Sequence, residues 1–113
     1  MITIESLKNF GANTEEGLAR CMGNEALYLK LVVVMLADKN FDKLKTAIES
    51  NNLDEAFEAA HALKGALGNL ALTPMYDMVV KITEPLRNRT KMDYGEMVSE
   101  LLTLRDKLSE LCA

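Results

Sequence analysis

A single histidine, His61, lies near the middle of the 113-residue chain, in a segment of alanine, leucine and glycine that could form a helix. A neutral imidazole nitrogen is a nucleophile that can take up a phosphoryl group. Lys64 would lie one helical turn away and supplies a cation that could hydrogen-bond the added phosphate. The pair could serve phosphoryl transfer, with His61 as the phosphoacceptor and Lys64 stabilising the phosphate, or could be an ordinary surface histidine and lysine.

The apolar residues around His61 follow a helical period. At about 100° per residue they form one continuous face, and His61 lies opposite it. The members of this face are Leu53, Ala56, Ala59, Ala60, Leu63, Ala66, Leu67, Leu70 and Ala71. A lone histidine is often a core residue, but this periodicity predicts that the imidazole is exposed to solvent.

The side of the helix that carries His61 is unusual for a solvated surface. Gly65 and Gly68 each cost about 1 kcal/mol relative to alanine inside a helix, so we expect them to clear space for a partner. Phe57 and Leu72 are apolar where polar side chains would be expected. The predicted docking surface consists of Phe57, Glu58, Gly65, Gly68 and Leu72.

The stretch Ala60-His61-Ala62-Leu63-Lys64-Gly65, followed by Gly68-Asn69-Leu70, resembles the signature of the histidine-containing phosphotransfer (HPt) family. The resemblance implies a four-helix bundle whose exposed histidine accepts a phosphoryl group from the aspartyl phosphate of a receiver domain. It also implies that Lys64 assists the phosphate and that the two glycines open the surface for docking. Many members have a glycine near the position of Ala71 or Leu72, which this chain lacks.

The resemblance also implies the partners, namely response-regulator receiver domains, a hybrid histidine kinase, or both. The sequence has no cluster of metal-binding carboxylates and no glycine-rich nucleotide loop, so we expect a phosphoryl carrier and no enzyme. We expect no cofactor, with Mg²⁺ bound only in the partner receiver. One alternative is a non-catalytic helical module that binds a receiver or kinase without taking phosphate. A metal- or cofactor-binding bundle is disfavoured by the single histidine and the lack of a Glu-x-x-His motif.

Composition narrows the class of protein. The net charge of −4 disfavours a nucleic-acid binder, which needs a basic face. Cys21 and Cys112 are not spaced as a metal or redox motif and are expected to be free thiols. The N-terminus lacks the pattern of a signal peptide, and the most apolar stretch, 27–37, is too short to span a bilayer and contains Lys30. We therefore expect a cytoplasmic monomer that binds neither nucleic acid nor membranes.

The chain is predicted to form one domain, residues 1–113. Its fold is expected to be all-α, an antiparallel four-helix bundle with one or two short additional helices at the N-terminus. Helix starts are expected at Thr14, with Gly23 closing that helix, and at Asn40, Asn52, Thr73-Pro74 and Asp93. Glu96 would complete a capping box with Asp93. The helix that opens at Asn52 is predicted to reach about Leu72.

Two segments leave alternatives open. Leu27–Leu36 contains Val32-Val33-Val34 and could be a buried strand by propensity alone. A lone strand among helices has no partner, which favours a helix. Pro85 lies inside a helical pattern and either kinks that helix or ends it early.

Overall fold

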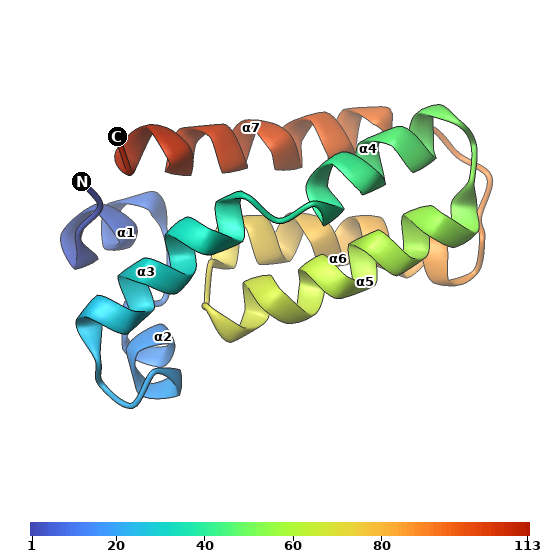
Figure 1. Cartoon of the computed structure of the whole chain (residues 1–113). Coiled ribbons are helices and arrows are strands. Elements are labelled where there is room, and N and C mark those ends of the chain that lie inside the picture. The colour runs from blue at the N-terminus through green and yellow to red at the C-terminus, as the bar shows by residue number, and fades with distance from the viewer.

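The structure, a computed structural model, describes all residues 1–113 and consists of α-helices joined by short loops, with no strand (Figure 1). The helices are α1 (Ile4–Phe10), α2 (Thr14–Arg20), α3 (Glu25–Leu36), α4 (Asn40–Glu49), α5 (Leu53–Asn69), α6 (Thr73–Arg87) and α7 (Gly95–Leu111). The predicted all-α class is confirmed. None of these helices combines the length and the apolar character that crossing a membrane requires.

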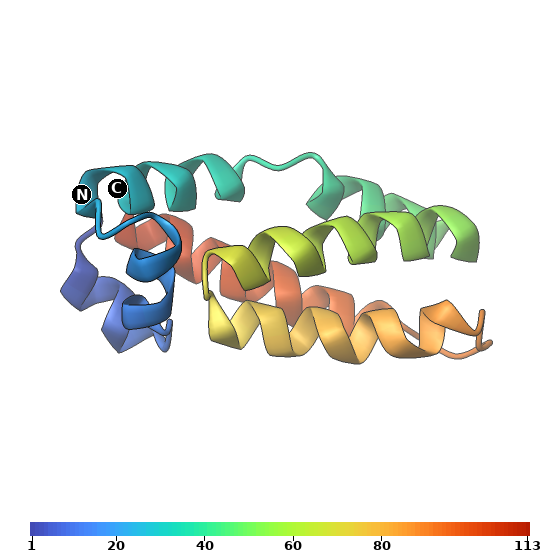
Figure 2. The same ribbon diagram turned by 90° about the horizontal axis from the view of Figure 1, so that it is seen from below.

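Helices α4 to α7 run up and down beside one another and form the antiparallel bundle. Figures 1 and 2 show that α3 continues the line of α4 along one edge, after a break at residues 37–39. The first helix of the bundle is therefore built in two pieces. Helices α1 and α2 are the predicted short additions and pack at the end of the bundle where both termini lie. There the Met1 amino nitrogen donates to the Ala113 carbonyl oxygen at 2.6 Å.

The apolar segment that could have been a strand forms α3, as the absence of a pairing partner predicts. The Asn24 side chain caps its start by accepting from the Leu27 backbone N–H at 3.0 Å. Tyr28 and Val32 are buried. The Tyr28 hydroxyl donates to the Leu70 carbonyl oxygen at 2.7 Å and so ties α3 to the residue that follows α5.

One hydrophobic core holds the helices together and reaches from Ile2 to Leu108. Helix α5 contributes one buried face, made of Ala56, Ala59, Ala60, Leu63 and Leu67. Alanine on this face lets neighbouring backbones come close, and α5 packs most extensively against α4 and α6. The predicted facing of α5 is thereby confirmed.

Several helix starts differ from the predicted caps. The Asn52 side chain does cap α5, accepting from the Glu55 N–H at 3.2 Å. The predicted capping box of Asp93 and Glu96 is wrong: α7 begins at Gly95, and Asp93 Oδ1 accepts from the Gly95 N–H at 2.8 Å. The intervening Tyr94 turns into the core, where its ring is buried, and this shifts the start of the helix.

Helices α2, α4 and α6 begin at the predicted residues Thr14, Asn40 and Thr73, but the cap position of each lies one residue earlier. The Asn13 side chain caps α2, and Thr14 is buried. Asn40 is the first helical residue of α4, and its backbone N–H donates to Asp38 Oδ1 at 2.7 Å. Likewise Thr73 belongs to α6, with Pro74 in its first turn. Gly23 adopts a φ of +74° and its N–H closes the turn after α2 on the Leu18 carbonyl at 2.7 Å.

Pro85 lies inside α6, and the helix continues past it to Arg87. Only the last turn follows the proline, so a single missing backbone hydrogen bond has little effect on the helix. A neighbouring polar group is also satisfied: the buried Thr83 hydroxyl donates to the Val79 carbonyl oxygen at 2.7 Å.

Helix α5 ends three residues earlier than predicted, at Asn69, and this changes the position of Leu72. Ala71 adopts a left-handed backbone with a φ of +53° and reverses the chain. Leu72 then faces the core and is fully buried. The prediction that Leu72 shares the exposed side with His61 is wrong, because the helical wheel no longer applies beyond Asn69.

Candidate functional site around His61

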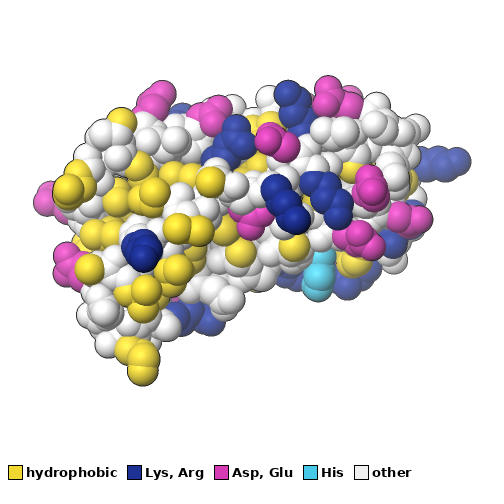
Figure 3. Space-filling model, viewed as in Figure 1, with side chains coloured by type: hydrophobic (Ala, Val, Ile, Leu, Met, Phe, Trp, Pro, Cys, Tyr) yellow, Lys and Arg dark blue, Asp and Glu magenta, His cyan; other side chains and the backbone are white.

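His61 occupies the middle of α5 on the side opposite the buried face, and its side chain is exposed. Figure 3 shows the histidine at the surface, with lysine, arginine and carboxylate side chains gathered around it. The exposure of His61 predicted from periodicity is confirmed. An imidazole at such a position is accessible to a second macromolecule without any opening of the bundle.

Phe57 fixes one face of the imidazole. It lies one turn before His61 on α5, and the two rings stack with centroids 5.6 Å apart and an angle of 19° between their planes. Phe57 is half-buried and packs against the core. The stack restricts the rotamers of His61, and the residue remains exposed to solvent.

Two arginines that sequence analysis missed lie over the ring of Phe57. The guanidinium carbons of Arg87 and Arg89 are 5.4 Å and 4.8 Å from its centroid, within the range of a cation–π contact. Arg89 is held by Asp54 at 2.6 Å and by the Leu86 carbonyl oxygen at 2.8 Å. The histidine therefore lies next to an aromatic ring that is in contact with two guanidinium cations.

Lys64 lies on the same side of α5 as His61, as predicted. Its Nζ is 3.7 Å from Oε1 of Glu84 on α6, and the side chain is half-buried. Oε2 of Glu84 is in turn 3.6 Å from Nε of Arg87. The carboxylate of Glu84 is thus shared by two cations near His61.

The two glycines of α5 have different surroundings. A Cβ on Gly65 would meet nothing within 4 Å, so the absent side chain leaves open space on the surface. A Cβ on Gly68 would lie 3.1 Å from the Tyr76 ring. Gly65 fits the predicted role of clearing space for a partner, whereas Gly68 also lets Tyr76 of α6 lie close against α5.

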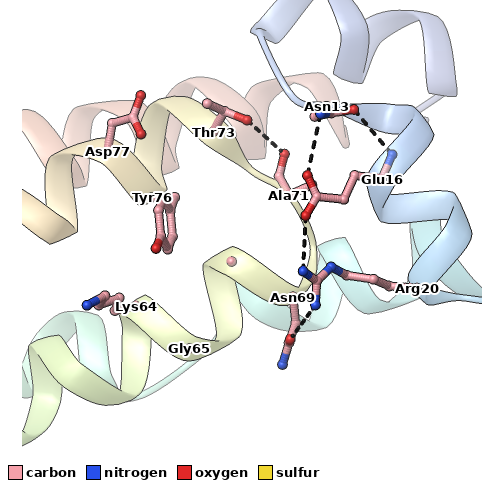
Figure 4. Close-up of a pocket in the computed structure, with 11 residues that line it drawn as sticks. Asn13, Glu16, Arg20, Lys64, Gly65, Asn69, Ala71, Thr73, Tyr76 and Asp77 are labelled. Atoms are coloured by element: carbon pink, nitrogen blue, oxygen red, sulfur yellow. Dashed lines mark hydrogen bonds and ion pairs between the residues drawn. The ribbon is translucent and has the colours of Figure 1, made fainter.

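A groove of about 540 Å³ lies beside Gly65 and Gly68, between α5, α6 and α2. In Figure 4, Tyr76 projects from α6 toward α5. The opposite end of the groove is formed by α2, where Arg20 bonds both Asn69 and Glu16. The groove therefore joins the surface near Lys64 to the N-terminal helices.

The two remaining residues of the predicted docking surface lie apart from this groove. Glu58 is exposed and pairs with Lys43 of α4 at 3.6 Å, on the flank of α5 that faces α4. Leu72 is buried and cannot contact a partner. The exposed predicted surface thus consists of Phe57, Glu58, Gly65 and Gly68 around His61.

A comparison with protein-family models matches residues 32–113 to the Hpt domain. The match covers well over half of the chain. This protein belongs to the Hpt domain family. Members of this family carry phosphoryl groups in two-component signalling. Searches of curated proteins and of solved structures gave no significant match.

The Hpt match includes every residue of the predicted site and the whole of α4 to α7. Helices α1 and α2 precede the match, so the α2 end of the groove lies outside it. No group of three or more metal-binding side chains occurs in the structure.

Of the two missed arginines, Arg87 could have been found from the hairpin of α5 and α6, whereas Arg89 lies beyond the end of α6. In an antiparallel pair, residues equally far before and after the turn lie side by side. With the turn centred at Leu72, Phe57 is opposite Arg87 and Gly68 is opposite Tyr76, as observed. Locating that turn one residue inaccurately would already misplace Arg87, and its left-handed Ala71 gives no sequence signal.

Proposed function

We propose that this Hpt domain accepts a phosphoryl group on His61 from the aspartyl phosphate of a receiver domain and passes it to a second receiver. The observation that carries the proposal is the exposed imidazole, stacked on Phe57 and next to the open surface at Gly65. A receiver can approach His61 there without meeting another side chain at Gly65.

The transfer itself needs little from this chain beyond position and charge. A neutral imidazole nitrogen attacks phosphorus, the bond to the receiver's carboxylate oxygen breaks, and a nitrogen–phosphorus bond forms. Lys64 would leave Glu84 and bind a phosphoryl oxygen. Delivery to the second receiver is the reverse step, with an aspartate oxygen as the nucleophile.

The same function implies a cofactor requirement, a domain organisation and a cellular compartment for this protein. Mg²⁺ would be held by the receiver's own carboxylates, and this chain would need no cofactor. Residues 1–113 would act as one domain, because residues near both ends share one core, and we infer that this domain acts as a monomer. The free thiols of Cys21 and Cys112 fit a reducing compartment, so we infer that the protein acts in the cytoplasm with a kinase and its receivers.

The test is a transfer assay with a panel of phosphorylated receiver domains. We expect at least one receiver to label the protein with acid-labile phosphate, and His61→Gln to abolish the label without loss of helicity. Lys64→Gln should slow labelling several-fold, with a stability change below about 1 kcal/mol, because its ion pair is partly exposed. Receiver binding without any label would instead establish a non-catalytic interaction module.

A further inference from the structure

Glu84 on α6 binds two cations weakly. The distances from its oxygens to Lys64 Nζ and Arg87 Nε are 3.7 Å and 3.6 Å. A charge-assisted hydrogen bond spans about 2.7–2.9 Å, so neither cation donates a proper hydrogen bond to the carboxylate. More than half of the Glu84 side chain is exposed, and solvent weakens both ion pairs further. Either cation can therefore leave Glu84 for a stronger anion.

Arg87 and His61 both contact the ring of Phe57. Its guanidinium carbon is 5.4 Å from the Phe57 centroid, and the same ring stacks on the imidazole. The structure gives the Arg87 guanidinium an ion pair and a cation–π contact but no hydrogen bond. A planar fork of free N–H donors matches the oxygens of a phosphoryl group.

Two other arginines show that a ring contact alone does not leave an arginine free. Arg89 shares the Phe57 ring but is fixed by its bonds to Asp54 and to backbone carbonyls. Arg105 lies over Phe41 at 5.4 Å, the same distance as Arg87 from Phe57, and donates to Asp106 at 3.2 and 3.1 Å. Of the three, only Arg87 both contacts the ring that stacks on His61 and makes no hydrogen bond with its guanidinium.

We propose that Arg87 joins Lys64 in binding the phosphoryl oxygens of phosphorylated His61, and that Glu84 holds both cations until the phosphoryl group arrives. This inference rests on the proposed function of His61. A phosphoryl group offers several anionic oxygens in place of one shared carboxylate, so both cations gain shorter hydrogen bonds by moving. Glu84 competes with the phosphoryl group, and Arg87 therefore stabilises phosphohistidine while Glu84 destabilises it.

The test is the equilibrium of the phosphoryl group between the protein and a receiver that labels it. Arg87→Gln should lower the share on His61, with an equilibrium constant reduced about fivefold to tenfold. Glu84→Gln should raise the constant about twofold to threefold, because both cations are then free. Effects of opposite sign at two neighbouring positions are not expected from a structural role, since both residues are exposed and belong to the same ion pair.

Arg105→Gln is the matched control, because it removes an arginine from a phenylalanine ring elsewhere in the bundle. We expect it to leave the equilibrium constant unchanged. Unaltered constants for Arg87→Gln and Glu84→Gln, or changes in the same direction, would overturn the inference while the proposed function stands. A wild-type protein that no receiver labels would overturn the proposed function itself.

A second readout observes Arg87 directly in the wild-type protein. Phosphorylation of His61 by a small phosphoramidate donor should shift the NMR signal of the Arg87 Nε–H group and slow its exchange with water. The Arg105 signal, in the matched contact, should stay in place. An Arg87 signal as insensitive as that of Arg105 would contradict the inference even if the variants alter the equilibrium.

Discussion

Helix α5 packs Ala59, Leu63 and Leu67 into the core on one face, whereas its other face presents His61 and Gly65 to solvent. The buried face contains only apolar side chains of graded size, and its contacts with α4 and α6 hold the bundle together. The exposed face combines a nucleophile, a stacked ring and a helical position with no side chain. The difference implies that substitutions on the two faces separate stability from phosphoryl transfer.

The largest effect on stability is expected from the buried face. Leu63→Ala should lower the free energy of unfolding by about 2–5 kcal/mol, because it leaves a cavity where one methine and two methyl carbons are now packed. Urea denaturation measures the change, and the fraction that stays folded should still accept phosphate. The matched control is Leu31→Ala on α3, where the side chain is 38 % exposed and the loss should be small. Equal losses of unfolding free energy in the two variants would contradict the expected difference between the buried and the exposed positions.

Tyr28 of α3, which bonds the residue that follows α5, should make the free energy of unfolding depend on pH in the alkaline range. Burial, and secondly the nearby Cys21 thiolate, raise the pKa of Tyr28 above its ordinary value of 10.0. The folded state therefore retains the phenol proton more strongly than the unfolded state. The resulting stability is fully present below pH 10.0 and is lost as pH rises through the higher folded-state pKa.

Tyr28→Phe tests this pH dependence. It should cost about 0.5–1.5 kcal/mol at neutral pH, because the hydrogen bond to the Leu70 carbonyl is lost. Above pH 10.0 the variant should lose stability less steeply than the wild type in urea titrations. Parallel pH profiles for the two proteins would show that Tyr28 does not titrate with unfolding.

The smallest effect on stability, with a distinct effect on function, is expected at the exposed face. Gly65→Ala should raise the free energy of unfolding by about 1 kcal/mol, since alanine favours the helix and its Cβ meets nothing. Transfer from a receiver should become slower, because the methyl group occupies the docking surface. Gly68→Ala is the control for helix propensity and should gain less, since its Cβ would press on Tyr76 at 3.1 Å. Unchanged transfer in Gly65→Ala would remove the docking role of Gly65.

Sequence was sufficient for the parts of the site that follow from helical periodicity. The spacing of Leu63, Ala60 and Leu67 placed His61 on the exposed side, and that placement depends only on local geometry. The error at Leu72 arose where a non-glycine residue, Ala71, takes a left-handed backbone that no sequence signal indicates. The helix therefore seemed to continue past its end.

Tertiary packing determines the rest of the site. Arg87 contacts Phe57, and Glu84 contacts Lys64, only because α6 folds back against α5 in one register. Similarly, the sequence did not show that Asp93 bonds only the Gly95 N–H and forms no capping box with Glu96. The burial of Tyr94 decides where α7 begins. Pairwise spacing along the chain carries no information about such contacts until the turns between helices are located.

The measurement that tests the central claim most directly is localisation of the phosphoryl group after reaction with a phosphorylated receiver. Phosphorus–proton correlation NMR at neutral or alkaline pH detects which side chain carries the phosphorus. The chain has one histidine, so a correlation to imidazole protons assigns the group to His61 without ambiguity. We predict this correlation in the wild type and its absence in His61→Gln. A phosphoryl group on a hydroxyl or carboxylate side chain, or a receiver complex that never transfers phosphate, would contradict the account.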